Sequence, residues 1–158
     1  MPYTEVTLPG GAGVNDPLAL VALLDRIGPA ILLVHSQSGP DADALVAMRP
    51  NLVKGVINIE GNHAFPPAPA PAQISAYRDV PDLELFGDRV QGNPANTGQA
   101  RYDLRKKVSE SINASGGRSM IVQLPEVGLH GNTHMMMQDK NNLEVADYII
   151  GWIGQAVK

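Results

Sequence analysis

The fold follows from one stretch of the chain, Ala30-Ile-Leu-Leu-Val-His-Ser-Gln-Ser-Gly39. The apolar run at its start is typical of a parallel strand that is covered on both faces. A helix is predicted directly afterwards, because Asp41 and Asp43 favour the positive amino-terminal end of a helix and Pro50 closes it. The stretch therefore predicts a strand, a tight turn and a helix, which together form the repeating unit of an α/β sheet.

The same alternation continues along the chain. We expect strands at residues 30–34, 53–59, 83–86 and 120–124, and helices at residues 17–27, 40–48, 97–113 and 142–157. Strands that alternate with helices predict a three-layer α/β fold with a mostly parallel sheet and right-handed connections. Because 158 residues suffice for one ordinary core, we expect residues 1–158 to form a single domain.

Two local features add to this outline. Residues 61–80 are rich in proline and alanine, so we expect a stiff, extended, cap-like excursion without helix or strand. The last helix is expected to begin at Asn141 as its cap, with Glu144 placed to complete a capping box.

The composition excludes several classes of protein. The chain has no cysteine, so disulfides and thiolate metal sites are excluded. A net charge of −4 without a basic stripe argues against a nucleic-acid partner. No apolar run reaches the roughly 18 residues that a membrane span needs. No signal peptide is visible, so a cytoplasmic location is the default, and secretion or the periplasm stays open if an amino-terminal segment is missing.

Polar side chains follow the carboxyl ends of the predicted strands. They are Ser36, Glu60, Asp88 and His134. Sites of open α/β sheets form at this edge. Serine at a strand-to-helix turn, then acids, then histidine before the last helix, is the chain order of serine hydrolases of the α/β-hydrolase type.

Ser36 is the predicted nucleophile and His134 the general base that takes its proton. The backbone N–H of Gln37 is the predicted oxyanion donor, because it belongs to the residue after the nucleophile. The usual Gly-x-Ser-x-Gly pattern has lost both glycines here, since Gly39 comes one place late. An ordinary serine at a strand end and Ser38 as the nucleophile therefore stay open.

The triad acid is contested in the sequence. Glu60 ends the strand beside the nucleophile strand, and its long side chain could span the reach to His134. Asp88 follows the next strand and is the alternative acid, with Glu126 a distant third. We favour Glu60 over Asp88.

Other readings concern the residues around His134. Met135 and Met136 are expected to line the substrate pocket as adaptable apolar surface, although methionine runs more often pack in a core. His35 is expected to point away from the nucleophile. A metal site of Glu126, His130 and His134 is a disfavoured alternative, because the segment reads as a loop and not as the helix that this spacing suits. We expect no metal and no cofactor.

Four stretches carry a resemblance to a known family. They are His35-Ser-Gln-Ser-Gly-Pro40, Arg49-Pro-Asn-Leu-Val-Lys54, Ile59-Glu60 and the long segment 128–142. With them the chain resembles the atypical bacterial carboxylesterases of the α/β-hydrolase superfamily, the esterase 713-like group. The resemblance implies Glu60 as the triad acid, a small-molecule ester as the substrate, and hydrolysis through an acyl-serine.

The resemblance covers only the carboxyl-terminal portion of that family. The amino-terminal strands and the second oxyanion donor of the family have no counterpart before residue 14, so the strand at residues 30–34 is expected to leave an apolar edge open. We expect either a chain that is inactive alone because it is truncated, or one that pairs this edge in a homo-oligomer or with a complementing amino-terminal segment. A non-catalytic α/β subunit is the alternative function.

Overall fold

The computed structural model describes residues 17–62, 64–65, 69–90 and 98–157. The expected elements are present within these residues. The strands are β1 (Ala30–His35), β2 (Val53–Ile59), β3 (Asp82–Phe86) and β4 (Ser119–Gln123). The helices are α1 (Pro17–Ile27), α2 (Gly39–Met48), α3 (Pro71–Ser75), α4 (Gly98–Ala114) and α5 (Asn142–Ala156).

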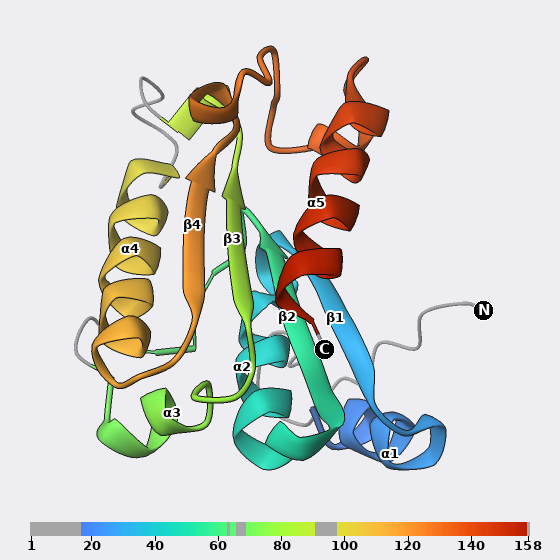
Figure 1. Ribbon diagram of the computed structural model, residues 1–158, viewed down its shortest axis with the longest axis vertical. Helices are drawn as coiled ribbons and strands as arrows, with labels where there is room; N and C mark the ends of the chain where they lie inside the picture. The colour runs from blue at the N-terminus through green and yellow to red at the C-terminus, as the bar shows by residue number, and fades with distance from the viewer. Residues whose placement is uncertain (1–16, 63, 66–68, 91–97, 158) are drawn as a thin grey trace, which may run out of the picture.

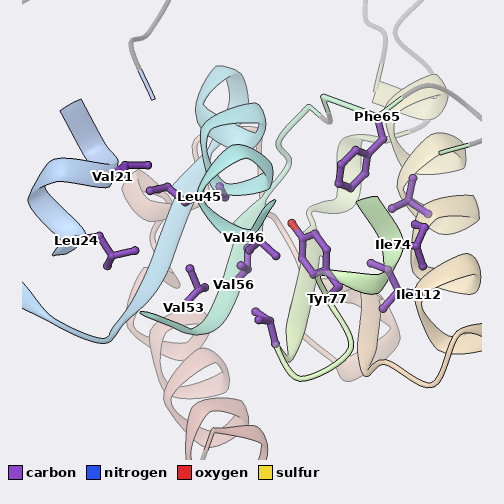
Figure 2. Close-up of a cluster of buried hydrophobic side chains, with 13 residues drawn as sticks. Val21, Leu24, Leu45, Val46, Val53, Val56, Phe65, Ile74, Tyr77 and Ile112 are labelled. Carbon is purple, nitrogen blue, oxygen red and sulfur yellow. The ribbon is translucent and has the colours of Figure 1, made fainter. Parts of the chain in front are cut away.

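The strands form one parallel sheet in the order β1-β2-β3-β4, with helices on both faces (Figure 1). Helices α1, α2, α3 and α4 contribute to an apolar cluster on one face, which Figure 2 shows, whereas α5 packs with a second cluster on the other face. The three-layer α/β prediction is therefore confirmed. Strand β2 supplies apolar side chains to both clusters, whereas Leu83 and Leu85 of β3 belong to the second cluster. Both clusters form because these side chains leave water.

Strand β1 differs from the two central strands. In the described part of the chain it lies at the edge of the sheet and pairs only with β2. Its residues are only partly buried, and the side chain of Leu33 is 58% exposed. The predicted apolar edge is present among the described residues.

Residues 69–80, within the segment 61–80, contain a helix that the composition does not predict. Pro71 opens the short helix α3, since a proline at the first turn loses no helical hydrogen bond. Ile74 and Tyr77 are buried in the cluster of Figure 2, together with Phe65. The expectation of an excursion without helix was wrong for residues 71–75, because apolar side chains anchor this part to the core.

The parallel register places the site. His35 of β1 pairs with Ile59 of β2, and Phe86 of β3 pairs with Gln123 of β4. The residues that directly follow these strands therefore meet at one edge of the sheet. Among the described residues, no helix is both long and apolar enough to cross a membrane.

Candidate active site

Ser36 lies at a sharp turn between β1 and α2. Its backbone has φ of 54°, in the left-handed region that non-glycine residues rarely adopt. A single 3-10 turn, Ser36–Ser38, leads directly into α2. A strained serine between a strand and a helix is the nucleophile elbow of hydrolases, although the flanking glycines of the usual pattern are absent here.

Gly39 explains why a glycine is still needed near the elbow. A Cβ at this position would overlap the carbonyl oxygen of Asn62, and the N–H of Asn62 donates to the carbonyl oxygen of Ser36 at 2.9 Å. The segment after β2 therefore packs against the elbow at a distance that excludes a side chain. The late glycine of the sequence has a steric role here.

Three side chains from different parts of the chain meet above the elbow. His134 Nε2 lies 3.0 Å from Ser36 Oγ, and His134 Nδ1 lies 2.7 Å from Glu60 Oε2. A carboxylate only accepts hydrogen bonds, so Nδ1 carries the proton that is donated to Glu60. Nε2 is then free to accept the hydroxyl hydrogen of Ser36, as a general base must.

Glu60 is held for this contact by its surroundings. It is buried, its backbone φ is 43°, and its Oε1 accepts the N–H of Gly87 at 2.9 Å. The guanidinium of Arg101 in α4 lies 4.0 Å from Oε2. A buried carboxylate with a backbone donor and a nearby cation is compensated for its loss of water.

Comparison with known proteins identifies the fold. No family model matches it. A solved structure described as a novel bacterial esterase superimposes with a TM-score of 0.81 at 33% sequence identity, and the match covers 90% of this chain. That similarity agrees with the parallel sheet and with the sharp turn at Ser36, and together they show the fold.

The chain has the α/β-hydrolase fold.

Two further proteins are similar to this chain. The protein named "Probable secreted lipase phiG" of Fungal sp. (strain ATCC 74256) is 28% identical over 176 residues, which cover 84% of this chain. A monoacylglycerol lipase structure of Paleococcus ferrophilus superimposes with a TM-score of 0.56 at 14% identity over 94% of this chain and 79% of that one, and shows the fold alone. The chain spans 48% of the fungal protein and 43% of the bacterial esterase.

Asp88, the alternative acid, contacts the backbone of the histidine loop and not the ring of His134. Its carboxylate accepts the backbone N–H of Gly131 at 2.8 Å and that of Asn132 at 3.0 Å, while its own N–H donates to the carbonyl oxygen of Asn132. The carboxylate that meets His134 is that of Glu60. Asp88 thus fastens the backbone of the histidine loop and does not orient the imidazole.

Most of the contacts that hold the histidine loop, residues 128–142, are not apparent from the sequence. Buried Asn132 donates to Asn141 Oδ1 at 2.9 Å, and Asp139 accepts both the N–H and the hydroxyl of Thr133. Asn141 donates to the carbonyl oxygen of His130, so its side chain is not used to cap α5 as predicted. The density of amide and carboxylate residues in segment 128–142 was the available signal.

Glu126, His130 and His134, the residues of the disfavoured metal site, do not converge on one point in the structure. Glu126 accepts the N–H of Gln123 at 3.4 Å, and His130 Nδ1 lies 3.9 Å from Asp88 Oδ2 while its side chain is largely exposed. His134 is committed to Ser36 and Glu60. In the part of the chain that the structure describes, no group of three or more potential ligands converges on one point.

Met135 and Met136 have unlike environments. Met136 has an exposed fraction of 0% and packs with Leu124 and Val145 in the cluster beneath α5, so its assignment to the substrate pocket is corrected to a core position. Met135 is 40% exposed beside His134 and stays a predicted substrate contact.

His35 contacts the histidine loop. Its ring lies against that of His134, with centroids 4.5 Å apart, and its Nε2 lies 2.8 Å from the carbonyl oxygen of His134. The sequence predicted only that this side chain points away from Ser36, and the contact arises because the histidine loop folds back over the end of β1. The contact joins residues 99 positions apart.

A buried polar cluster lies on the α4 side of the sheet. Arg105 Nε lies 2.8 Å from Glu84 Oε2, and Ser119 donates to Asp82 at 2.6 Å. Burial raises the pKa of Asp82 to about 6 and the pKa of Glu84 well above its usual value, although Arg105 opposes both shifts. Burial also raises the pKa of Tyr77, whose hydroxyl donates to Asp43. Asp82 begins β3, so the cluster extends away from the candidate active site.

Proposed function

We propose that this α/β hydrolase carries the triad of a serine carboxylesterase, with Ser36 as nucleophile, His134 as base and Glu60 as acid. The observation that supports it is the continuous contact from Ser36 Oγ through both ring nitrogens of His134 to Glu60 Oε2. The similarity to a bacterial esterase and to a protein named as a lipase agrees with an ester substrate. The substrate is a small carboxylic ester.

The proposed reaction begins with a proton transfer. Ser36 Oγ attacks the carbonyl carbon of the ester while His134 Nε2 takes the hydroxyl proton, and the carboxylate of Glu60 stabilises the imidazolium that forms. The N–H of Gln37, at the start of the 3-10 turn before α2, has no helical acceptor in an ideal first turn and is the proposed oxyanion donor.

Two bonds are then broken in turn. The ester C–O bond breaks as His134 returns the proton to the departing alcohol, which leaves an acyl group on Ser36. Water attacks the acyl carbon, His134 takes a proton from the water, and the carboxylic acid leaves as the proton passes back to Ser36 Oγ. No further reactant is needed.

Labelling with a fluorophosphonate ester probe tests this proposal. The probe bonds to an activated serine, so it reports on the nucleophile and base even where the oxyanion site is incomplete. We expect mass spectrometry to place the probe on Ser36, and Ser36→Ala and His134→Ala to abolish the reaction. Ser38→Ala is the matched control, since it removes the rival hydroxyl of the same turn. Labelling that persists in His134→Ala, or that maps to Ser38, would contradict the proposal.

The exposed edge of β1 supports a second candidate function, a non-catalytic subunit that pairs this edge with a second copy or with another polypeptide segment. The side chain of Leu33 on β1 is 58% exposed, and unpaired strand edges tend to bind further strands. Light scattering coupled to size exclusion distinguishes the two candidates. A monomer that hydrolyses p-nitrophenyl acetate would reject the subunit, whereas an oligomer without labelling at Ser36 would favour it.

A further inference from the structure

His35 precedes the proposed nucleophile in the chain and contacts the proposed base, and the triad does not use it. It is the last residue of β1, directly before Ser36. Its ring lies against the ring of His134 at a centroid distance of 4.5 Å and a tilt of 43°. Its Nε2 lies 2.8 Å from the backbone oxygen of His134. One side chain therefore contacts both the ring and the backbone of the proposed base.

The direction of this hydrogen bond is fixed by its acceptor. A carbonyl oxygen cannot donate, so Nε2 of His35 carries a hydrogen and donates it. This holds for the neutral Nε2–H form and for the doubly protonated ring alike. The contact therefore needs no particular charge on His35.

The backbone of His35 is held in place by several hydrogen bonds, so the donor nitrogen has a rigid support. His35 is paired with Ile59 in the ladder between β1 and β2. The hydroxyl of Ser38 donates to the carbonyl oxygen of His35 at 2.8 Å, and the N–H of His35 lies 3.3 Å from Ser38 Oγ. A ring on a strand end that is tied in this way can position a loop that has no regular structure of its own.

The other contacts of the histidine loop act on neighbouring residues. Asp88 accepts from the N–H groups of Gly131 and Asn132, and Asp139 accepts from the N–H of Thr133. The bond from His35 reaches the carbonyl oxygen of residue 134 itself. It therefore limits rotation of the peptide unit that follows the base, whose N–H, that of Met135, donates to Thr133 Oγ1 at 3.1 Å.

We propose that His35 is a positioning residue, whose Nε2–H holds the backbone of His134 so that the imidazole bridges Ser36 and Glu60. This inference rests on the proposed function, because it assigns His134 as the base. His35 does not touch the substrate in this assignment. It acts through His134, and a displacement of about 1 Å at a reacting group can cost about 10²-fold in rate.

Two substitutions separate the hydrogen bond from the bulk of the ring. His35→Gln keeps an amide N–H near the position of Nε2, whereas His35→Phe keeps an aromatic ring and removes the donor. We expect His35→Phe to lower the maximal rate of fluorophosphonate labelling at Ser36 about 10-fold or more, with the probe concentration for half-maximal rate unchanged. We expect His35→Gln to stay within about 3-fold of the unchanged protein. Circular dichroism and thermal unfolding serve as the control that both variants fold.

A second readout does not depend on labelling. The Nδ1–H of His134 that donates to Glu60 should give a low-field proton resonance, which we expect to be sharp in the unchanged protein and in His35→Gln and broadened or lost in His35→Phe. Nitrogen-15 spectra of the unchanged protein should show hydrogen on Nε2 of His35, and this check applies even where a variant does not fold.

Each result decides between separate claims. Equal labelling rates and equal low-field resonances in His35→Phe and the unchanged protein would overturn the positioning role. So would a folded His35→Gln that fails as badly as His35→Phe, or a His35 ring with hydrogen on Nδ1 alone. Absence of labelling in the unchanged protein, with the low-field resonance still sensitive to His35→Phe, would reject the esterase function and keep the positioning role.

Discussion

Ser36 and Glu60 occupy matching positions on neighbouring strands, and both have left-handed backbone, with φ of 54° and 43°. Each directly follows a residue of the paired register, His35 in β1 and Ile59 in β2. Neither residue is glycine, so their left-handed backbone stores strain. This strain lies at the carboxyl ends of β1 and β2, where the histidine loop packs. The proposed nucleophile and the proposed acid therefore share the same backbone conformation at the ends of neighbouring strands.

Glu60→Gln should separate the acid from its rivals. A glutamine cannot stabilise the imidazolium and can hold the wrong tautomer of His134, so labelling of Ser36 should fall by about 10²–10⁴-fold. Stopped-flow or gel-based labelling measures this rate. Glu126→Gln is the matched control at an exposed acid outside the triad contact, and we expect it to label like the unchanged protein. A loss in the control equal to that in Glu60→Gln would argue against Glu60 as the acid.

Asp88→Asn should act on the histidine loop first. The substitution weakens two charge-assisted bonds to the N–H groups of Gly131 and Asn132, so we expect unfolding to require about 1–3 kcal/mol less free energy. Urea denaturation measures this change. Hydrogen exchange at these two amides should accelerate more than exchange at the amides of β3. Unchanged exchange at both amides would contradict the assigned contacts.

Gly39→Ala and Gly151→Ala form a matched pair of substitutions. A Cβ at Gly39 overlaps the carbonyl oxygen of Asn62, so the elbow must shift, and both stability and labelling should decrease. Gly151 lies inside α5 with open space around it, so alanine should stabilise the protein by about 0.5–1 kcal/mol. Thermal unfolding of both variants checks the opposite signs.

The stability of the protein should fall as the pH rises through the range where Asp82 titrates. Its pKa is about 6 in the folded state and 3.8 ordinarily, so the folded state binds more protons between these values. The contribution is complete below the ordinary pKa and is lost as the pH rises through about 6, on the order of 3 kcal/mol.

Asp82→Asn should remove this contribution. Its side-chain oxygen still accepts the hydroxyl hydrogen of Ser119, so the fold is retained. Compared with the unchanged protein, the free energy of unfolding should then decrease less between pH 4 and pH 7. Urea denaturation at both pH values measures this difference, and equal pH dependence in the two proteins would show that Asp82 does not titrate in this range.

The fold was predictable because each strand and most helices are encoded by a short, continuous stretch of sequence. The apolar run at residues 30–34 and the alternation that follows it predict the parallel sheet, and every predicted strand lies within two residues of its observed bounds. The helix α3 was missed because proline content argues against helices, whereas the burial of Ile74 and Tyr77 is decided by the core. Tertiary packing overrode local preference at that point.

The candidate site was predictable in its residue types and less so in its contacts. Ser36, Glu60 and His134 follow from strand ends and chain order, and the structure brings them together. The orientation of His35 and the use of Asp88 depend on how the loop after β4 folds back over the sheet. No periodicity in the sequence records that path, since it is set by side-chain contacts with distant backbone.

The long sequence separations within the triad have a kinetic consequence. The contact of His134 with Ser36 joins residues 98 positions apart, and its contact with Glu60 joins residues 74 apart. Such non-local contacts form slowly during folding because long loops must close first. In a refolding experiment, the reactivity of Ser36 toward a serine-directed reagent should therefore recover after the helical ellipticity. The hydroxyl of Ser36 thus serves as a chemical probe of the last step of folding.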